Sequence, residues 1–400
     1  MAAIDILNLI LNETPHIIAF PGSCKRVRFR KNNCRRCVDI CPEKVISLDC
    51  GPTINHGCSD CGLCQNVCPT EVFQNELCTD QYLLNQAQSF LDQDKSSGGK
   101  KTVTFYCHQA ESEYKHSLFI PCLGRITENI ILGVALSGFD EVILIKGICS
   151  QCRLKQGDGL LTNALLAAHG LLEGSGLEKF SVGVKEKGKK KERILGRREI
   201  FSQISDQVKN KATSFLYHRE KDFQRKSAGN LQNEDGKRLS PRRRLLDKLL
   251  GQKDWQKAMV LRYRPEFPWG NIKIDENICS ICGTCLVLCP TGAISKKLEE
   301  GSQTFYFKSS LCTNCSLCKE ACPQKAIDFE EDFALAGLLE GDAKIVATVE
   351  LTSCLGCGEI IPAGRGKLCP TCRKRQGWPT QGTLKEEKSA NREEGFDAHL

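Results

Sequence analysis

Cysteine is the residue type in this chain whose number and spacing point to chemistry. The 400 residues include 26 cysteines, most of them in CxxC or CxxCxxC clusters. Such clusters hold metal or form disulfides, and disulfides belong mainly to oxidising compartments. The opening residues MAAIDILNLILN have neither the basic segment nor the cleavage site of a secretion signal. We therefore expect metal centres in a reduced, cytoplasmic protein.

Two complete copies of the motif CxxCxxCxxxCP begin at Cys279 and Cys312. The first three thiolates of each copy can reach one 4Fe-4S cluster, and the fourth cysteine, which precedes proline, ligates the other cluster. Zinc sites use pairs of CxxC instead. Residues 256–335 resemble the bacterial two-cluster ferredoxin domain, with strands expected after each Cys-Pro and at 305–307. The two predicted ligand sets are group 3 (Cys279, Cys282, Cys285, Cys322) and group 4 (Cys312, Cys315, Cys318, Cys289).

Residues 1–84 carry the same plan with one departure. The half from Cys58 to Cys68-Pro69 is complete, but the upstream half reads CRRCVDICP, with Lys31 where the first cysteine should stand. Cys24 is the expected replacement, Cys50 is the alternative ligand, and a three-iron cluster is the other alternative. By analogy the predicted 4Fe-4S ligands are group 1 (Cys24, Cys34, Cys37, Cys68) and group 2 (Cys58, Cys61, Cys64, Cys41).

The segment 102–182 reads as an α/β domain. TVTFYC, LFIPC and VILIKGIC each predict a short buried strand with a cysteine at its carboxyl end, and FSVGV is a possible fourth strand. RITENIILGVALSGF predicts a helix that stops at Gly138, and NALLAAHGLLEG predicts another. Because open parallel sheets place ligands beyond the carboxyl ends of their strands, we expect four cysteines to converge there. This sheet-edge group is Cys107, Cys122, Cys149 and Cys152.

The sheet-edge group could hold a 2Fe-2S cluster or zinc, or act as a thiol-disulfide centre. The stretches FIPCLGRIT and GFDEVILIKGICSQCRLKQG, with the earlier FYC, are similar to the delta subunit of methyl-viologen-reducing hydrogenases. That subunit passes electrons into heterodisulfide reductase. The resemblance implies a 2Fe-2S cluster on these four cysteines.

Near the end of the chain, two CxxC pairs form a C-terminal group (Cys354, Cys357, Cys369, Cys372). Two such pairs look like a zinc ribbon, whose closed tetrahedral shell has no open position for chemistry. We expect structural zinc, with a single iron of the rubredoxin kind as the alternative. Cys50 and Cys78 remain, and are interpreted as small buried hydrophobes.

The fold class expected is α+β multidomain: two ferredoxin-like dicluster domains (1–84 and 256–335), an α/β parallel-sheet domain (102–182) and a zinc ribbon (345–380). Residues 183–255 read as a solvated basic linker with one or two surface helices, and 381–400 as a disordered tail. The longest apolar runs are too short for a membrane span. The formal charge of +8 counts thiolates as neutral, whereas each four-thiolate metal site contributes about −2.

The sequence lacks a dinucleotide fingerprint, a P-loop, HExxH and a nucleophile elbow. We therefore expect an electron-transfer component rather than a stand-alone catalyst. It would relay electrons between a low-potential donor and flavin-containing oxidoreductase subunits of the heterodisulfide reductase or hydrogenase type in anaerobic metabolism. The alternative is a thiol-disulfide or sulfur-transfer enzyme that uses Cys149 and Cys152. Nucleic acid is not an expected partner.

Overall fold

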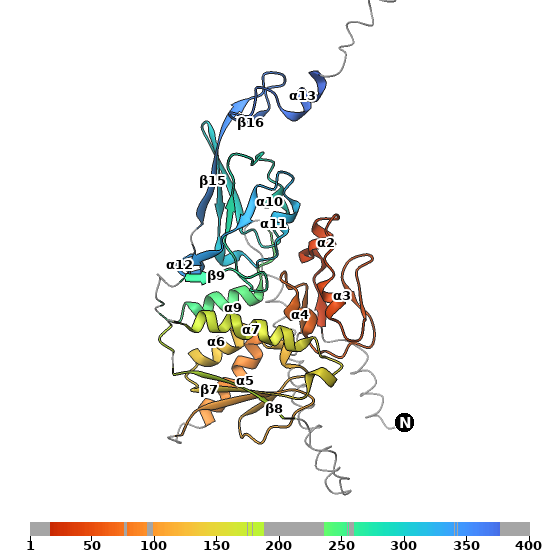
Figure 1. The fold of residues 1–400 in the computed structure, drawn as a ribbon, viewed down its shortest axis with the longest axis vertical. Coiled ribbons are helices and arrows are strands. Elements are labelled where there is room, and N and C mark those ends of the chain that lie inside the picture. The colour runs from red at the N-terminus through yellow and green to blue at the C-terminus, as the bar shows by residue number, and fades with distance from the viewer. Residues whose placement is uncertain are drawn as a thin grey trace, which may run out of the picture.

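The computed structural model describes residues 17–75, 78–93, 99–173, 175–177, 179–187, 236–253, 255, 260–339, 341 and 343–376. Most of the predicted linker and the tail at 381–400 lie outside these described residues. Figure 1 shows the parallel sheet at one end of the molecule and the C-terminal group's helix α13 at the other. Within the described part of the chain, no helix is long and apolar enough to cross a bilayer.

The N-terminal block, called the head here (described residues 17–75), has little regular structure. Two short antiparallel pairs and three short helices surround its cysteines, and the second and third helices end where a Cys-Pro pair forces extended backbone. The pairs are β1 (Ile17–Ala19) with β4 (Phe73–Asn75) and β2 (Ile46–Ser47) with β3 (Thr53–Ile54), and the helices are α2 (Lys25–Arg28), α3 (Arg36–Ile40) and α4 (Leu63–Val67).

The middle domain contains the predicted parallel sheet, with strand order β6-β5-β7-β8. All four expected strands are present, and α6 ends where Gly138 takes a φ of +93°. Its elements are α5 (Asp80–Gln93), β5 (Thr102–Tyr106), β6 (Ser117–Phe119), α6 (Glu128–Leu136), β7 (Glu141–Lys146), α7 (Gly157–Leu172) and β8 (Ser181–Glu186). Short 3-10 turns η2 (Leu123–Arg125) and η3 (Cys149–Gln151) carry the chain around the sheet edge.

The second ferredoxin-like block is built on a larger antiparallel sheet in the order β11-β12-β15-β16. The expected strands begin at Ile294 and Ile327, and residues 305–307 lie in β12, so these predictions are confirmed. Its strands are β9 (Val260–Arg262), β10 (Ile272–Ile274), β11 (Ile294–Glu299), β12 (Ser302–Phe307), β13 (Ile327–Phe329), β14 (Asp332–Ala334), β15 (Lys344–Ser353) and β16 (Ile360–Pro362). Its helical elements are α10 (Thr284–Leu288), η4 (Ser309–Leu311), α11 (Leu317–Ala321), α12 (Ala336–Leu339) and α13 (Pro370–Gln376).

The internal repeat is visible in the backbone. The third residue after each Cys-Pro cysteine has a left-handed conformation, with φ of 53° at Lys44, 48° at Glu71, 74° at Gly292 and 57° at Lys325. Positive φ is uncommon outside glycine, so four matching positions indicate one shared turn. The four copies therefore have the same local geometry around the Cys-Pro cysteine.

Helix α9 (Pro241–Leu250) corrects the interpretation of 183–255 as a solvated linker. In Figure 1 it lies between α6 and α7 of the middle domain and the second ferredoxin-like block. Leu246, Leu249 and Leu250 are buried, and the Arg242 guanidinium pairs with the Glu128 carboxylate, whose side chain is fully buried. A buried carboxylate needs a partner, and this basic segment supplies it. The solvated interpretation is wrong for residues 240–250.

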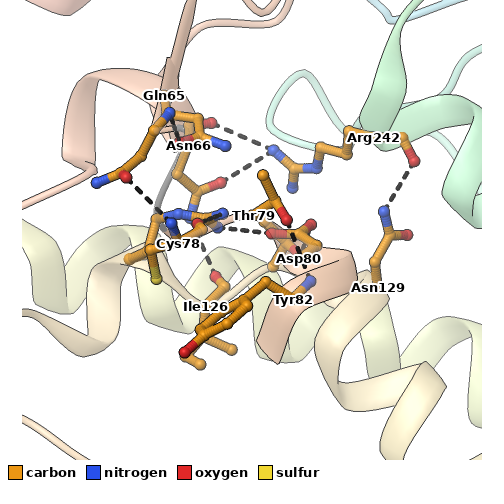
Figure 2. Close-up of polar contacts among 12 residues, drawn as sticks. Gln65, Asn66, Cys78, Thr79, Asp80, Tyr82, Ile126, Asn129 and Arg242 are labelled. Carbon is orange, nitrogen blue, oxygen red and sulfur yellow. Dashed lines mark hydrogen bonds and ion pairs between the residues drawn. The ribbon is translucent and has the colours of Figure 1, made fainter. Parts of the chain in front are cut away.

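Figure 2 shows how Arg242 ties α9 to the head and to the middle domain. Its Nη1 donates to the Asn66 side-chain oxygen at 2.9 Å, and its backbone carbonyl accepts from the Asn129 amide at 2.8 Å. Nearby, Asp80 pairs with the buried Arg125 at 2.7 Å. Buried polar groups that pair across two elements favour a single arrangement of those elements, so the head's α4 is held in place against the middle domain.

Candidate iron-sulfur and metal sites

Groups 3 and 4 each come together in the second ferredoxin-like block. Burial, followed by the nearby thiols of Cys279, Cys282 and Cys322, raises the pKa of Cys285 to about 12. Burial, followed by the other three members of group 4, likewise raises the pKa of Cys318. Each fourth cysteine thus lies with the triplet of the other motif copy, as the crossed pattern predicts. Assignment of individual ligands stays a prediction.

Backbone amides face the sulfur atoms of these groups. The amide of Ala293 donates to Cys289 Sγ at 3.3 Å, that of Asn314 to Cys312 Sγ at 3.4 Å and that of Ala326 to Cys322 Sγ at 3.4 Å. Such bonds stabilise negative charge on sulfur and tune iron-sulfur potentials. A mostly half-buried set of cysteine sulfurs with amide donors fits an iron-sulfur cluster.

The head brings groups 1 and 2 together in the same way. Burial and then the thiols of Cys68, Cys34 and Cys24 raise the pKa of Cys37 to about 12. The pKa of Cys64 is raised by burial and then by the other members of group 2. Cys24 therefore lies where the missing ligand is needed.

The two remaining cysteines differ in exposure. Cys50 is exposed, so its interpretation as a small buried hydrophobe is wrong: it lies in the loop between β2 and β3, where Asp49 is also exposed. Cys78 is half-buried and packs against the main core of the middle domain.

The sheet-edge group lines one small cavity beyond the carboxyl ends of β5 and β7. Amides of Gly147, Gly124 and Leu154 face Cys107, Cys122 and Cys152 at 3.3–3.4 Å. Burial is the main cause that raises the pKa of Cys122 to about 12 and of Cys149 to about 11. The convergence predicted from the parallel sheet is present, and the donor set fits an iron-sulfur cluster or a single soft metal ion.

Two residues of this site carry no signal in the sequence. A Cβ at Gly157 would lie 2.4 Å from Cys122 Sγ, so this position has room only for hydrogen. Gly157 also begins α7, whose N-terminal partial positive charge favours thiolate. His108 Nδ1 lies 2.7 Å from the Pro121 carbonyl, which can only accept, and its Nε2 lies 3.7 Å from Cys152 Sγ. His108 directly follows Cys107 in the sequence, but only the fold brings it to Cys152 and brings Gly157 to Cys122.

The head and the sheet-edge group share a contact. Cys61 and Leu63 pack with Leu154 in a small apolar cluster that Cys122 and Cys152 also join. The Asn66 side-chain amide donates to the carbonyls of Gly124 at 2.7 Å and Ile126 at 3.0 Å; Figure 2 shows the latter bond. Group 2 thus lies directly against the sheet-edge group.

The C-terminal group has a different geometry. Its four sulfur atoms all lie within 4.8 Å of one another, and no other set of three or more His, Cys, Asp or Glu among the described residues is as close. Cys357 Sγ and Cys369 Sγ are 3.7 Å apart, near the roughly 3.8 Å edge of a tetrahedron with Zn–S bonds of about 2.3 Å. The amide of Cys369 donates to Cys354 Sγ and is the main cause that lowers the pKa of Cys354 to about 6. The group fits one tetrahedral ion.

Comparison with known families identifies one part of the chain. The family model for a 4Fe-4S dicluster domain matches residues 278–326, which hold all eight cysteines of groups 3 and 4. The chain contains a 4Fe-4S dicluster ferredoxin domain. No curated protein matches the sequence. The match supports 4Fe-4S clusters in this dicluster domain and an electron-transfer role.

The dicluster domain holds the C-terminal group in a fixed position. Arg365, in the loop between the two CxxC pairs, donates from Nη1 to the carbonyl of Cys279 at 2.9 Å. The backbone amide of Thr348 donates to Glu276 Oε1 at 2.6 Å. Strand β15 joins β12 of the domain to β16 of the C-terminal segment. The C-terminal group is therefore anchored beside group 3.

Proposed function

We propose that this protein is an iron-sulfur electron-transfer subunit that relays electrons between a low-potential donor and a larger oxidoreductase complex. The observation that most supports this proposal is the contact between Cys61 of group 2 and the sheet-edge cysteines Cys122 and Cys152. Two cysteine groups that share one apolar cluster can exchange an electron without a mobile carrier. A chain that only stored metal would have no need for this contact.

Groups 1 to 4 would each hold a 4Fe-4S cluster, the sheet-edge group a 2Fe-2S cluster and the C-terminal group zinc. Bound clusters supply one-electron chemistry, and the protein tunes their potentials through burial and amide hydrogen bonds. The residues facing the sheet-edge thiolates suit this role, because Gly124, Gly147 and Leu154 donate amide hydrogens and Gly157 leaves room beside sulfur.

The partners proposed are flavin-containing subunits of the heterodisulfide reductase or hydrogenase type, in the cytoplasm of an anaerobic cell. The support is the likeness of the segment around Cys122, Cys149 and Cys152 to the hydrogenase delta subunit. A partner of this type would supply the catalytic site that the sequence lacks. We do not propose nucleic acid as a partner.

Purification without oxygen tests the proposal directly. We expect about 18 iron atoms per chain if four 4Fe-4S clusters and one 2Fe-2S cluster fill, one zinc ion, and several interacting signals in an EPR redox titration. Co-purifying flavoprotein subunits would identify the partner. A folded, active preparation that contains zinc but no iron would contradict the proposal.

His108 favours a second candidate, a thiol-disulfide or sulfur-transfer enzyme at Cys149 and Cys152. Because Pro121 O takes the Nδ1 hydrogen, neutral His108 directs an unprotonated Nε2 toward Cys152 Sγ, 3.7 Å away. A base in this position can accept the thiol proton. This candidate predicts that Cys152→Ser abolishes turnover of a small disulfide with iron content unchanged. Loss of 2Fe-2S absorption in that variant favours electron transfer instead.

A further inference from the structure

The departure of the head from the ferredoxin repeat has a structural counterpart. Between Cys24 and Cys34 the chain forms helix α2 and a turn, and none of residues 25–36 takes the left-handed backbone found between the first two cysteines of the complete motifs, at Asp60, Ile281 and Asn314. The segment from Lys25 to Asn33, called the bridge loop here, replaces the missing CxxC with a longer path.

Polar side chains of the bridge loop cross to the dicluster domain. Lys25 Nζ pairs with Glu320 Oε1 at 2.7 Å, and the Asn32 side-chain amide donates to the other oxygen of Glu320. Both Lys25 and Asn32 are only 7% exposed. A buried ammonium and a buried amide that share one carboxylate fix the orientation of the two surfaces, because leaving either buried group unpaired is costly.

Arg28 makes the second set of contacts with the dicluster domain, at the C-terminal end of α10. Its Nε donates to the carbonyl of Leu288 at 2.9 Å, and its Nη2 to those of Val287 at 3.0 Å and Cys289 at 3.3 Å. The last carbonyls of a helix have no partner inside the helix, and a cation there is favourable. Lys237 Nζ donates to the carbonyl of Leu286, one residue before Val287, at 2.5 Å. The end of α10 is thus fully capped from outside its domain.

The residues at both ends of these contacts neighbour predicted ligands. The bridge loop is bounded by Cys24 and Cys34 of group 1. On the other side, α11 carries Glu320 between Cys318 of group 4 and Cys322 of group 3, and α10 carries Cys285 of group 3 and leads into Cys289 of group 4. Burial raises the pKa of Cys315 of group 4, and the nearby Lys25 ammonium opposes this rise, which places group 4 next to the bridge loop. The bridge loop therefore joins the ligand-bearing elements of groups 1 and 4.

We propose that the bridge loop is an alignment device that holds group 1 of the head against group 4 of the dicluster domain, with Lys25, Arg28 and Asn32 as positioning residues. This inference rests on the proposed function. With group 2 against the sheet-edge group, it makes one continuous path through the chain: group 3, group 4, group 1, group 2, sheet edge. Each transfer oxidises one centre and reduces the next by one electron, and no atom or proton need move.

The test uses the full chain purified without oxygen and the double variant Arg28→Ala/Glu320→Ala. A sub-stoichiometric pulse of dithionite is followed by rapid freezing and EPR, which reports how fast electrons distribute among the clusters. We expect equilibration between the two domains to slow by about tenfold or more, because the two surfaces are no longer held at a fixed separation and orientation. Iron and sulfide per chain should stay unchanged.

The matched control is Arg30→Ala/Glu300→Ala, which removes the same charges from exposed positions of the bridge loop and of the turn between β11 and β12. It should behave as the unmodified protein. Equal rates in both double variants would overturn the inference and leave the proposed function intact, whereas absence of clusters in the unmodified protein would overturn the proposed function. If the double variant loses iron, Glu320→Gln, which keeps the side-chain shape, should still slow equilibration, and an unchanged rate there would contradict the inference.

Discussion

The head and the dicluster domain use the same cysteine plan but are supported differently. The dicluster domain has its own core of twelve buried residues, including Phe305 and Phe307 on β12. The head's core has six, two of which are Cys24 and Cys64. Its strands are two or three residues long, whereas β12 and β11 are six. The comparison teaches that one motif can be supported by its own sheet or by contacts with neighbouring domains.

The largest expected effect follows from removal of metal. Structural metal sites contribute on the order of 10 kcal/mol to folding, and the head has little else. After anaerobic chelation, amide hydrogen exchange should show the head fully open, β11 and β12 partly protected, and β5 and β7 of the middle domain unchanged. If the head kept its protection from amide exchange without metal, the proposed difference in support between the head and the dicluster domain would be wrong.

Next in size is the effect of Arg242→Ala, which leaves the Glu128 carboxylate buried and unpaired. Breaking a buried pair in this way costs about 3–5 kcal/mol, and the head should lose its docking through Asn66. Chemical denaturation of the full chain, followed by exchange in the head, measures the effect. Arg244→Ala, at an exposed position of the same helix, should change stability little.

A smaller effect compares the four shared turns. Gly292→Ala forces a side chain into a φ of +74° and should destabilise the dicluster domain by about 1–2 kcal/mol. Lys325→Gly relieves the same strain in the next copy and should stabilise it slightly. Thermal unfolding of holo-protein measures both changes. Equal shifts of the same sign would show that the turns are not equivalent.

The smallest effect should come from Cys50→Ser. Cys50 is exposed and is not among the thiols that raise the pKa of Cys37, so stability should stay within about 0.5 kcal/mol and iron content should not change. Cys24→Ser, in contrast, should lose about four iron atoms or convert one cluster to a three-iron form. Iron analysis and EPR decide between them, and the reverse result would make Cys50 the ligand.

Sequence reasoning succeeded where spacing is set locally. Cysteine triplets closed by Cys-Pro predicted the dicluster domain, and short apolar strands ending at Cys107, Cys122 and Cys149 predicted the parallel sheet and its convergent edge. These patterns depend on residues close together in the chain. The same local logic placed Cys24, rather than Cys50, beside the rest of group 1.

It failed where long-range contacts decide. A run of arginines is most often solvated, and nothing near Arg242 shows that its partner is Glu128, more than a hundred residues away. Gly157 and His108 have no motif, and they matter only because the fold puts them beside Cys122 and Cys152. Likewise Lys31, standing where a cysteine was expected, gave no hint that its segment contacts Glu320.

Strand β15 has a consequence for how this molecule meets others. Six of its first seven residues pair with β12, with a bulge at Val346, and its last three pair with β16, so one strand runs from the sheet of the dicluster domain to the C-terminal group. Figure 1 shows this strand as the stalk beneath β16 and α13. A protein that binds the C-terminal group is therefore held at a fixed distance from Cys279, because β15 and the Arg365 contact together keep that group in place.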